Sequence, residues 1–177
     1  GHSAGGQLVG LMENAHDLSS IFTFGSSSGS LRNMDFPFKA KAHFFMSAFI
    51  PLNNLLLGYT NSPWMKMGEP LPKNVAAQWS EWCKGSGYIQ MALGKYIFLH
   101  HYKDLDIPSM WVNAIDDDIS NNKNVDDMTR VYEKLKIERL ILDPKKLGYP
   151  SIGHMGFFKD QSQELWNRAI RWLDQHS

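Results

Sequence analysis

The spacing of apolar residues predicts a helix, a strand and a loop near the start of the chain. Apolar side chains recur at i, i+3 and i+4 over 3–13, which predicts a helix that begins almost at once. The β-branched and aromatic run over 20–24 predicts a short strand. The Gly/Ser cluster over 25–30 predicts the loop that follows it.

The C-terminal part of the chain alternates between strand and helix patterns. Apolar runs over 109–115 and 138–142 predict two strands, and the segment 124–136 between them has helical spacing. A last amphipathic helix is predicted over 161–175. Its expected inward face consists of Leu165, Trp166, Ala169, Ile170 and Leu173. Strands that alternate with helices indicate an α/β fold with a mainly parallel sheet.

Between 31 and 105 the sequence changes character, because Met, Phe and Trp become frequent. Helical spacing occurs there over 38–51 and 73–84. We therefore expect an α/β core formed by 1–30 and 106–177, with a mostly helical insertion over 31–105. The aromatic and Met side chains of the insertion either cover an apolar substrate group or pack the insertion's own core.

Length and charge narrow the classes of partner. The 177 residues are about one domain in length. Lys plus Arg and Asp plus Glu number 18 each, which argues against a nucleic-acid-binding surface. The apolar stretch 44–59 is interrupted by Pro51 and two asparagines, so no membrane span is expected. Cys83 is the only cysteine, which excludes an intrachain disulfide and suits a reducing compartment, so we expect a cytoplasmic protein.

The first five residues, Gly-His-Ser-Ala-Gly, fit the pattern G-x-S-x-G of a nucleophile elbow. In such an elbow Ser3 stands on a sharp strand-to-helix turn, and side chains at Gly1 and Gly5 are expected to collide with neighbouring backbone. The turn also places the backbone N–H of Ala4 at the start of the helix, where it can stabilise a developing oxyanion. The motif therefore predicts Ser3 as the nucleophile and Ala4 as an oxyanion-hole donor.

An acid and a base follow the serine in the chain order Ser, then Asp or Glu, then His. Asp116, Asp117 and Asp118 lie in the turn expected after the strand 109–115, and each is a candidate acid that would hold an imidazole in one tautomer. His154 lies in a glycine-flanked loop after the last strand and is the candidate base.

The remaining histidines and the cysteine predict no metal and no cofactor. His2 lies inside the elbow and is expected to point away from the nucleophile. The adjacent pair His100 and His101 lacks a recognisable zinc spacing, and Cys83 is too isolated to form a thiolate site.

These motifs resemble the α/β-hydrolase superfamily. Within it, the chain looks like the uncharacterised bacterial predicted hydrolases marked by Gly-His-Ser-Ala-Gly-Gly-Gln, a run that 1–7 matches. The resemblance extends through the acidic turn and through 152–158, and therefore covers nearly the whole chain. It implies Ser3 and His154 as functional residues.

For the acid, the resemblance favours Asp117. Such enzymes commonly read Asp-Asp-Pro-Ile at this turn, and the second Asp of that run is the catalytic one. Asp118 stands where proline is usual. Asp116 and Asp118 therefore stay open as alternatives.

The resemblance also implies that the chain is the C-terminal part of this fold. The strand that leads into Ser3 would lie outside the chain, as would the loop that supplies the second oxyanion N–H. The 31–105 segment would form a helical cap over the active site. We expect the chain alone to be poorly active or inactive. Its first strand would present an open edge that pairs with the missing N-terminal half or with a second copy.

The predicted function is a serine hydrolase that cleaves a carboxylic ester or thioester through an acyl-enzyme. Its expected partner is a small-molecule ester or acyl substrate. Two alternatives stay open. An acyltransferase would share the acyl-enzyme but use another acceptor, and a member of the fold could bind without catalysis.

Overall fold

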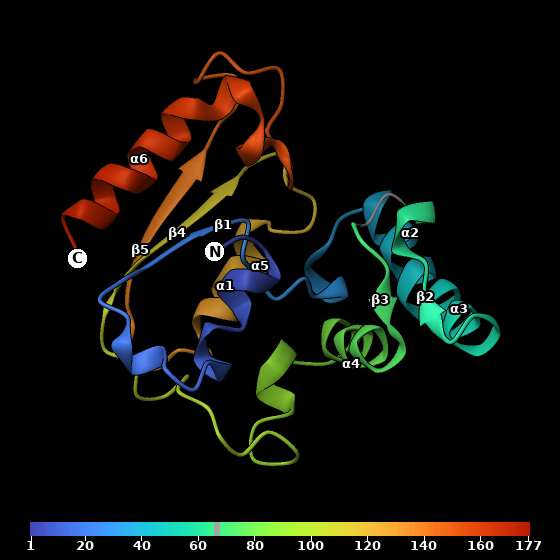
Figure 1. Cartoon of the computed structure of the whole chain (residues 1–177). Helices are drawn as coiled ribbons and strands as arrows, with labels where there is room; N and C mark the ends of the chain where they lie inside the picture. Colours follow the sequence, from blue (N-terminus) through green and yellow to red (C-terminus); the bar gives the residue numbers. More distant parts are fainter. Residues whose placement is uncertain (66–67) are drawn as a thin grey trace.

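A three-stranded parallel sheet organises the segments on either side of the 31–105 region (Figure 1). The computed structural model describes residues 1–65 and 68–177. The strand order is β1-β4-β5, and both neighbouring pairs are parallel. The strands span β1 Ile21–Phe24, β4 Pro108–Ala114 and β5 Lys136–Leu142. The prediction of an α/β fold with a parallel sheet is confirmed, and the carboxyl ends of all three strands meet at one edge.

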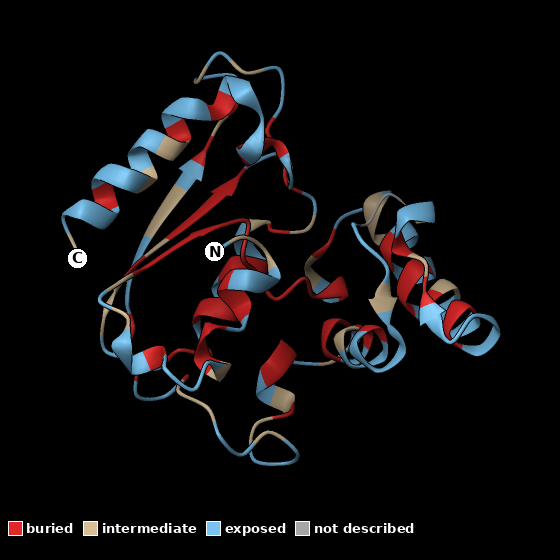
Figure 2. Ribbon diagram, in the orientation of Figure 1, coloured by how far each residue is buried: buried red, intermediate tan, exposed pale blue. Residues whose placement is uncertain are grey.

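Helices cover both faces of this sheet. α1 (Ala4–Gln7) and α5 (Asn122–Thr129) lie on one face, and α6 (Gln163–Asp174) lies on the other (Figure 1). Successive strand side chains point to opposite faces, so Ile21 joins the core on the α5 side whereas Phe22 joins the core beneath α6. The strands β1 and β4 are accordingly buried along most of their length (Figure 2).

The helix predicted over 3–13 is wrong in length. α1 ends at Gln7, and a separate 3₁₀ turn follows over Val9–Leu11. Gly10 in that turn lies against the Tyr102 ring, since a Cβ at Gly10 would stand 2.5 Å from the ring's Cδ1. This close contact with a distant part of the chain accounts for a glycine where a continuous helix would favour another residue.

The expected open edge of β1 is occupied by the elbow itself. The Ser3 N–H donates to the Phe24 carbonyl oxygen at 3.0 Å, and the Phe24 N–H donates to the Gly1 carbonyl oxygen at 2.9 Å. His2 forms a parallel bridge with Phe24. The first residues therefore run alongside β1 and carry Ser3 to the carboxyl edge of the sheet. Pairing with a missing half or a second copy stays a prediction.

The 31–105 region is mostly helical and lies beside the sheet (Figure 1). Its longer helices span α2 Phe38–Phe44, α3 Ile50–Leu56 and α4 Lys73–Lys84. The predicted helix over 73–84 is therefore confirmed, and the one over 38–51 corresponds to α2 and α3, joined by a π-helical segment. Its status as an insertion into a core of 1–30 and 106–177 stays a prediction.

Periodicity did not predict the two-residue antiparallel pair of β2 (Tyr59–Thr60) and β3 (Leu71–Pro72). Strands this short carry no periodic signal. Among the described residues, no helix is both long and apolar enough to cross a membrane.

The helix predicted over 124–136 is also shorter than expected, because α5 ends at Thr129. Beyond it the chain turns so that Tyr132 is buried under the first helix. The Gly10 N–H donates to the Tyr132 hydroxyl at 3.2 Å, and this hydroxyl donates to the Gly6 carbonyl oxygen at 3.3 Å. These hydrogen bonds satisfy the backbone groups of Gly6 and Gly10, close to Ser3 in sequence.

The predicted inward face of α6 is partly wrong. Leu165 is buried as expected, but Ile170 is 56% exposed and Leu173 is 38% exposed. Trp172, which the sequence reasoning left out, is only 8% exposed and meets the Phe22 ring edge-on at 5.7 Å. The large indole therefore replaces the aliphatic residues as the anchor of the helix C-terminus.

We expect Trp172→Ala to lower the free energy of unfolding by about 3–5 kcal/mol, because it removes a large buried side chain. Ile170→Ala, two residues away on the exposed face, should cost less than about 1 kcal/mol. Chemical denaturation of both variants measures the difference. Equal losses would contradict this orientation of α6.

Candidate active site

Ser3 stands at a sharp turn between the segment beside β1 and α1. Its φ is 48° and its ψ is −119°, a combination that residues with a side chain rarely adopt. Two backbone bonds close the turn. The Gly5 N–H donates to the His2 carbonyl oxygen at 2.8 Å, and the Gly6 N–H donates to the Ser3 carbonyl oxygen at 3.1 Å. The strain is local to Ser3, and it is the backbone state expected of a nucleophile elbow.

The flanking glycines only partly follow the expectation. A Cβ at Gly1 would lie 2.8 Å from the Gly5 carbonyl carbon, so this position requires glycine. A Cβ at Gly5 would meet no described atom within 4 Å, and the expectation of a collision there is wrong. The tight contact occurs instead at Gly6, where a Cβ would overlap the side chains of Ser26 and Thr23. Gly6 thus allows α1 to lie directly on the end of β1.

His154 reaches Ser3 from the loop that follows β5. Its Nε2 lies 3.0 Å from Ser3 Oγ, within the range in which a base can accept the hydroxyl proton. Gly153 has a φ of 56°, in the left-handed region that glycine adopts without strain. That backbone conformation turns the chain just before the imidazole.

Asp117 lies on the other side of the imidazole. Its Oδ2 accepts a hydrogen bond from His154 Nδ1 at 2.8 Å. Its Oδ1 accepts the N–H groups of Ile119 at 2.9 Å and Ser120 at 2.8 Å. The residue is only 2% exposed, so these three donors provide the polar contacts that a buried carboxylate needs. A proton on Nδ1 leaves the Nε2 lone pair directed at Ser3.

The two neighbouring aspartates occupy different positions. Asp116 accepts the Ile152 N–H at 2.9 Å and the Gly153 N–H at 3.0 Å, and so holds the loop that carries His154. Asp118 is exposed, and partial desolvation followed by the charges of Asp117 and Asp116 raises its pKa. The structure thus brings together Ser3, His154 and Asp117. Asp116 does not contact the imidazole but binds the backbone just before His154.

His2 contacts the backbone of His154. Its Nε2 donates to the His154 carbonyl oxygen at 2.9 Å, since a carbonyl can only accept. Its ring meets Phe158 edge-on at 4.9 Å. Desolvation lowers the pKa of His2, which favours the neutral form. His2 is therefore a second support for the His154 loop, and no sequence pattern predicted this contact.

Gln7 connects the elbow helix to the 31–105 region. The Tyr88 hydroxyl donates to Gln7 Oε1 at 2.6 Å, and Gln7 Nε2 donates to the Ser27 carbonyl oxygen at 2.5 Å. All of these groups are buried. Gln7 ends the Gly-His-Ser-Ala-Gly-Gly-Gln run, so the motif contained the residue although its role was not predicted.

Asn124 is a fully buried side chain that the sequence reasoning missed. Its Oδ1 accepts the Ser28 hydroxyl at 3.0 Å and the Ser30 N–H at 3.1 Å. Its Nδ2 donates to the Ile119 carbonyl oxygen at 2.8 Å. Asn124 therefore ties the loop after β1 to the turn that holds Asp117.

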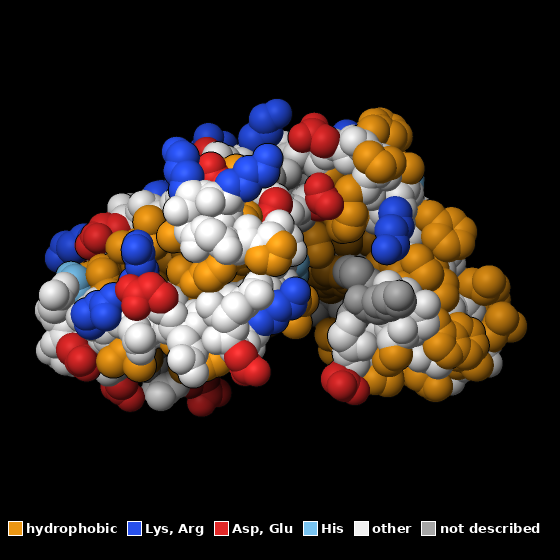
Figure 3. Space-filling model, turned by 90° about the horizontal axis from the view of Figure 1, so that it is seen from above, with side chains coloured by type: hydrophobic (Ala, Val, Ile, Leu, Met, Phe, Trp, Pro, Cys, Tyr) orange, Lys and Arg blue, Asp and Glu red, His pale blue; other side chains and the backbone are white. Residues whose placement is uncertain are grey.

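An apolar cleft of about 420 Å³, including its open mouth, begins beside this turn. Ile119, whose N–H bonds Asp117, lines it from the sheet side. The side chains that face it from the 31–105 region include Met34, Phe38, Phe45, Met46 and Trp79. Figure 3 shows hydrophobic side chains along the hollow between the two parts of the molecule.

The backbone N–H of Ala4 belongs to the first turn of α1, and such groups have no acceptor within their own helix. Among the residues that the structure describes, His16, His101 and Asp104 are close enough together to hold a metal ion.

Comparison with solved structures gives several matches at low sequence identity, three of which follow. A protein described as a lipase from Acinetobacter baumannii AYE is 18% identical with a TM-score of 0.49, over 99% of this chain and 59% of that one. A thermophilic esterase from Thermogutta terrifontis, solved with malate, is 15% identical with a TM-score of 0.46, over 100% of this chain and 64% of that one. Esterase RhEst1 from Rhodococcus sp. ECU1013 is 16% identical with a TM-score of 0.42, over 100% and 64%.

The chain thus spans less than two thirds of the length of each of these structures. Comparison with protein-family models gives no match. Comparison with curated proteins gives none either.

Proposed function

We propose that this chain carries the catalytic centre of a serine hydrolase of the α/β-hydrolase type, which acts on a carboxylic ester or thioester. The observation that carries the proposal is the continuous chain of contacts from the buried Asp117 through His154 to Ser3, with distances of 2.8 Å and 3.0 Å. The strained backbone of Ser3 supports it independently. The chain order of the three residues along a parallel sheet is also that of α/β hydrolases.

In this reaction His154 accepts the Ser3 proton at Nε2 while Ser3 Oγ attacks the substrate carbonyl carbon. The Asp117 carboxylate stabilises the imidazolium that forms and keeps its ring in place. His154 then returns the proton to the leaving alcohol or thiol, and an acyl-enzyme forms on Ser3. Water attacks the acyl group with His154 again as base, and the acid product leaves.

The negative charge that develops on the carbonyl oxygen needs donors aimed at it from the start. The Ala4 N–H is our assignment for the first donor, because it adjoins Ser3 and lies in the first turn of α1. A second donor is expected from a segment that we do not assign.

The apolar cleft is our assignment for the acyl group of the substrate. Its lining is made of Met, aromatic and aliphatic side chains, and it begins at Ile119 beside the catalytic acid. In this proposal the 31–105 region acts as a cap over the bound substrate. An apolar acyl chain would gain binding energy there by leaving water.

Treatment of the purified full-length protein with a fluorophosphonate probe tests the proposal. Wild type should become labelled on one serine, because an activated hydroxyl attacks phosphorus as it attacks a carbonyl. Ser3→Ala should not be labelled. If wild type stays unlabelled where a known serine hydrolase reacts, the enzyme is inactive and the binding-protein alternative replaces it. Release of acid from an ester in water separates hydrolysis from acyl transfer.

Three substitutions distinguish the aspartates. Asp117→Asn should lower kcat by on the order of 10³–10⁴-fold, because the imidazole loses its tautomer and its counter-charge. Asp116→Asn should lower kcat about tenfold, through displacement of His154. Asp118→Asn should leave kcat unchanged within about twofold, because its side chain is exposed. Steady-state kinetics of the full-length protein on a p-nitrophenyl ester measures all three. A larger loss in Asp116→Asn or Asp118→Asn than in Asp117→Asn would contradict the assignment.

Two substitutions on α2 test the acyl cleft. Ala42 lines the cleft, whereas Ala40 on the same helix is exposed. Ala42→Phe should reduce kcat/KM for an octanoate ester about tenfold or more relative to an acetate ester, because the new ring takes the place of the long chain. Ala40→Phe should leave this ratio unchanged. An equal effect on both esters in Ala42→Phe would place the acyl group elsewhere.

A further inference from the structure

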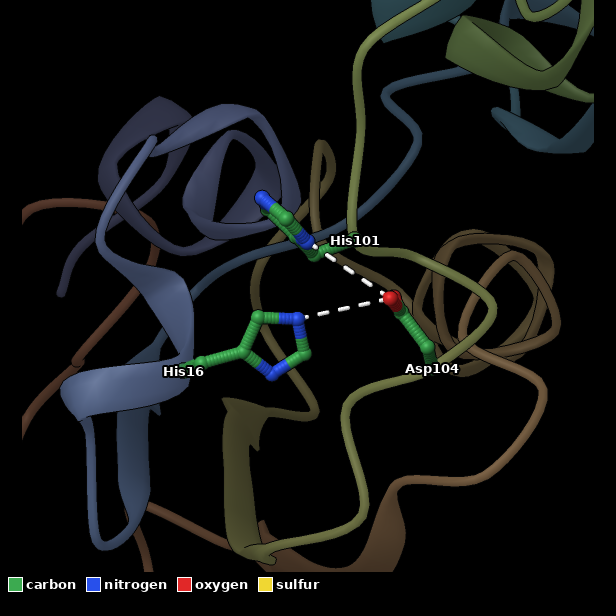
Figure 4. A group of neighbouring side chains, drawn as sticks. All are labelled: His16, His101 and Asp104. Carbon is green, nitrogen blue, oxygen red and sulfur yellow. Dashed lines mark ion pairs between the residues drawn. The ribbon is translucent and has the colours of Figure 1, made fainter.

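His16, His101 and Asp104 form a cluster of neighbouring side chains (Figure 4). His16 lies in the 3₁₀ turn Ala15–Asp17 that precedes β1, and the other two lie in the segment that precedes β4. They therefore stand at the amino ends of the parallel strands. Ser3, Asp117 and His154 follow the strands and stand at the carboxyl ends. The cluster is thus separate from the proposed catalytic centre.

The three ligand-type atoms are arranged around a common point. His16 Nε2 lies 3.3 Å from Asp104 Oδ2, and His101 Nδ1 lies 3.6 Å from the same oxygen. All three atoms lie within 4.8 Å of one another. Metal–ligand bonds of about 2.0–2.2 Å place neighbouring ligands of a tetrahedral zinc roughly 3.3–3.6 Å apart. Two of the three separations therefore already fit an ion held between the side chains.

The His101 ring supplies an independent indication. Its Nδ1 is inaccessible to water and makes no hydrogen bond to any described residue. A buried polar atom of this kind normally has a partner. The separation of 3.6 Å from Asp104 is too long for a charge-assisted hydrogen bond, which measures about 2.7–2.9 Å. A cation bound to Nδ1 and to the carboxylate would satisfy both atoms.

The surroundings hold the site and leave it open. The His101 N–H donates to the Gly10 carbonyl oxygen at 2.7 Å, which fixes the backbone that carries the ring. The two imidazoles are nearly perpendicular, with centroids 4.5 Å apart, as when two rings approach one ion from different directions. The side chains of His16 and Asp104 are 53% and 51% exposed, so an ion can enter and water can complete its coordination.

We propose that His16, His101 and Asp104 bind one divalent transition-metal ion of the zinc class. Two imidazole nitrogens and one carboxylate oxygen form a donor set that suits zinc and related metals better than calcium or magnesium. The ion joins the segment after the elbow helix to the segment that enters β4. It therefore acts as a structural clip between parts of the chain that are distant in sequence, and it stabilises the folded state by binding to it.

Titration of the chelator-treated, purified protein with Zn²⁺ tests this site. Wild type should bind one Zn²⁺ per chain by calorimetry, and its melting temperature should rise by a few degrees with saturating ion. Co²⁺ should give the visible absorption of a low-coordinate site. His16→Ala and Asp104→Asn should each weaken binding by at least about tenfold and abolish the rise in melting temperature. Both side chains are half-exposed, so both variants should keep the fold, which circular dichroism checks.

His43→Ala is the matched control, because His43 is an exposed histidine on α2 and lies outside the cluster. It should bind Zn²⁺ as wild type does. Absence of saturable binding in wild type would overturn the proposal, and so would unchanged affinity in both His16→Ala and Asp104→Asn. Labelling of Ser3 by the fluorophosphonate probe should be the same with and without Zn²⁺, so this proposal and the proposed function succeed or fail separately.

Discussion

The buried hydrogen bond between Asp117 and His154 is the contact on which the rest of the site depends. A carboxylate removed from water is unstable unless donors surround it. Here two backbone N–H groups and the imidazole provide them. Because β4 and β5 are parallel neighbours, the loops after them begin side by side, and Asp117 lies close to His154 although 36 residues separate them in sequence. The same edge receives Ser3 through the segment paired with β1.

Around that contact, other polar side chains bind the backbone of the loop that carries His154. Asp116 holds two N–H groups of the His154 loop, and His2 holds the carbonyl oxygen of His154 itself. Asn124 and Gln7 donate hydrogen bonds to the carbonyl oxygens of Ile119 and Ser27, in the loops after β4 and β1. Asn124 and Gln7 are buried, so breaking their contacts would leave unsatisfied polar groups. The contacts of Asp116 and His2 restrain the backbone that carries the imidazole.

The sequence was sufficient for features that depend on local chemistry or on chain order. The elbow glycine Gly1, the parallel sheet, and the order of Ser3, an acidic turn and His154 follow from such signals. They left Asp116, Asp117 and Asp118 open, and only the resemblance to a known family favoured Asp117. The sequence was not sufficient where contacts between distant parts of the chain determine where a helix ends or which of its faces is buried. The first helix is interrupted where Gly10 meets Tyr102, and Trp172 rather than Ile170 anchors α6. Asn124 and the grouping of His16 with His101 have no signal in spacing, because their partners come together only in the folded chain.

We propose that Ser3 attacks the substrate carbonyl with His154 as its base. The oxyanion that forms on the substrate would then accept a hydrogen bond from the Ala4 N–H. A crystal structure of the protein after reaction with a phosphonate ester tests this most directly. The account predicts phosphorus bonded to Ser3 Oγ, a phosphonyl oxygen about 2.7–3.1 Å from the Ala4 nitrogen, and His154 Nε2 beside the adduct. An adduct on another residue, or a phosphonyl oxygen directed away from Ala4, would contradict it.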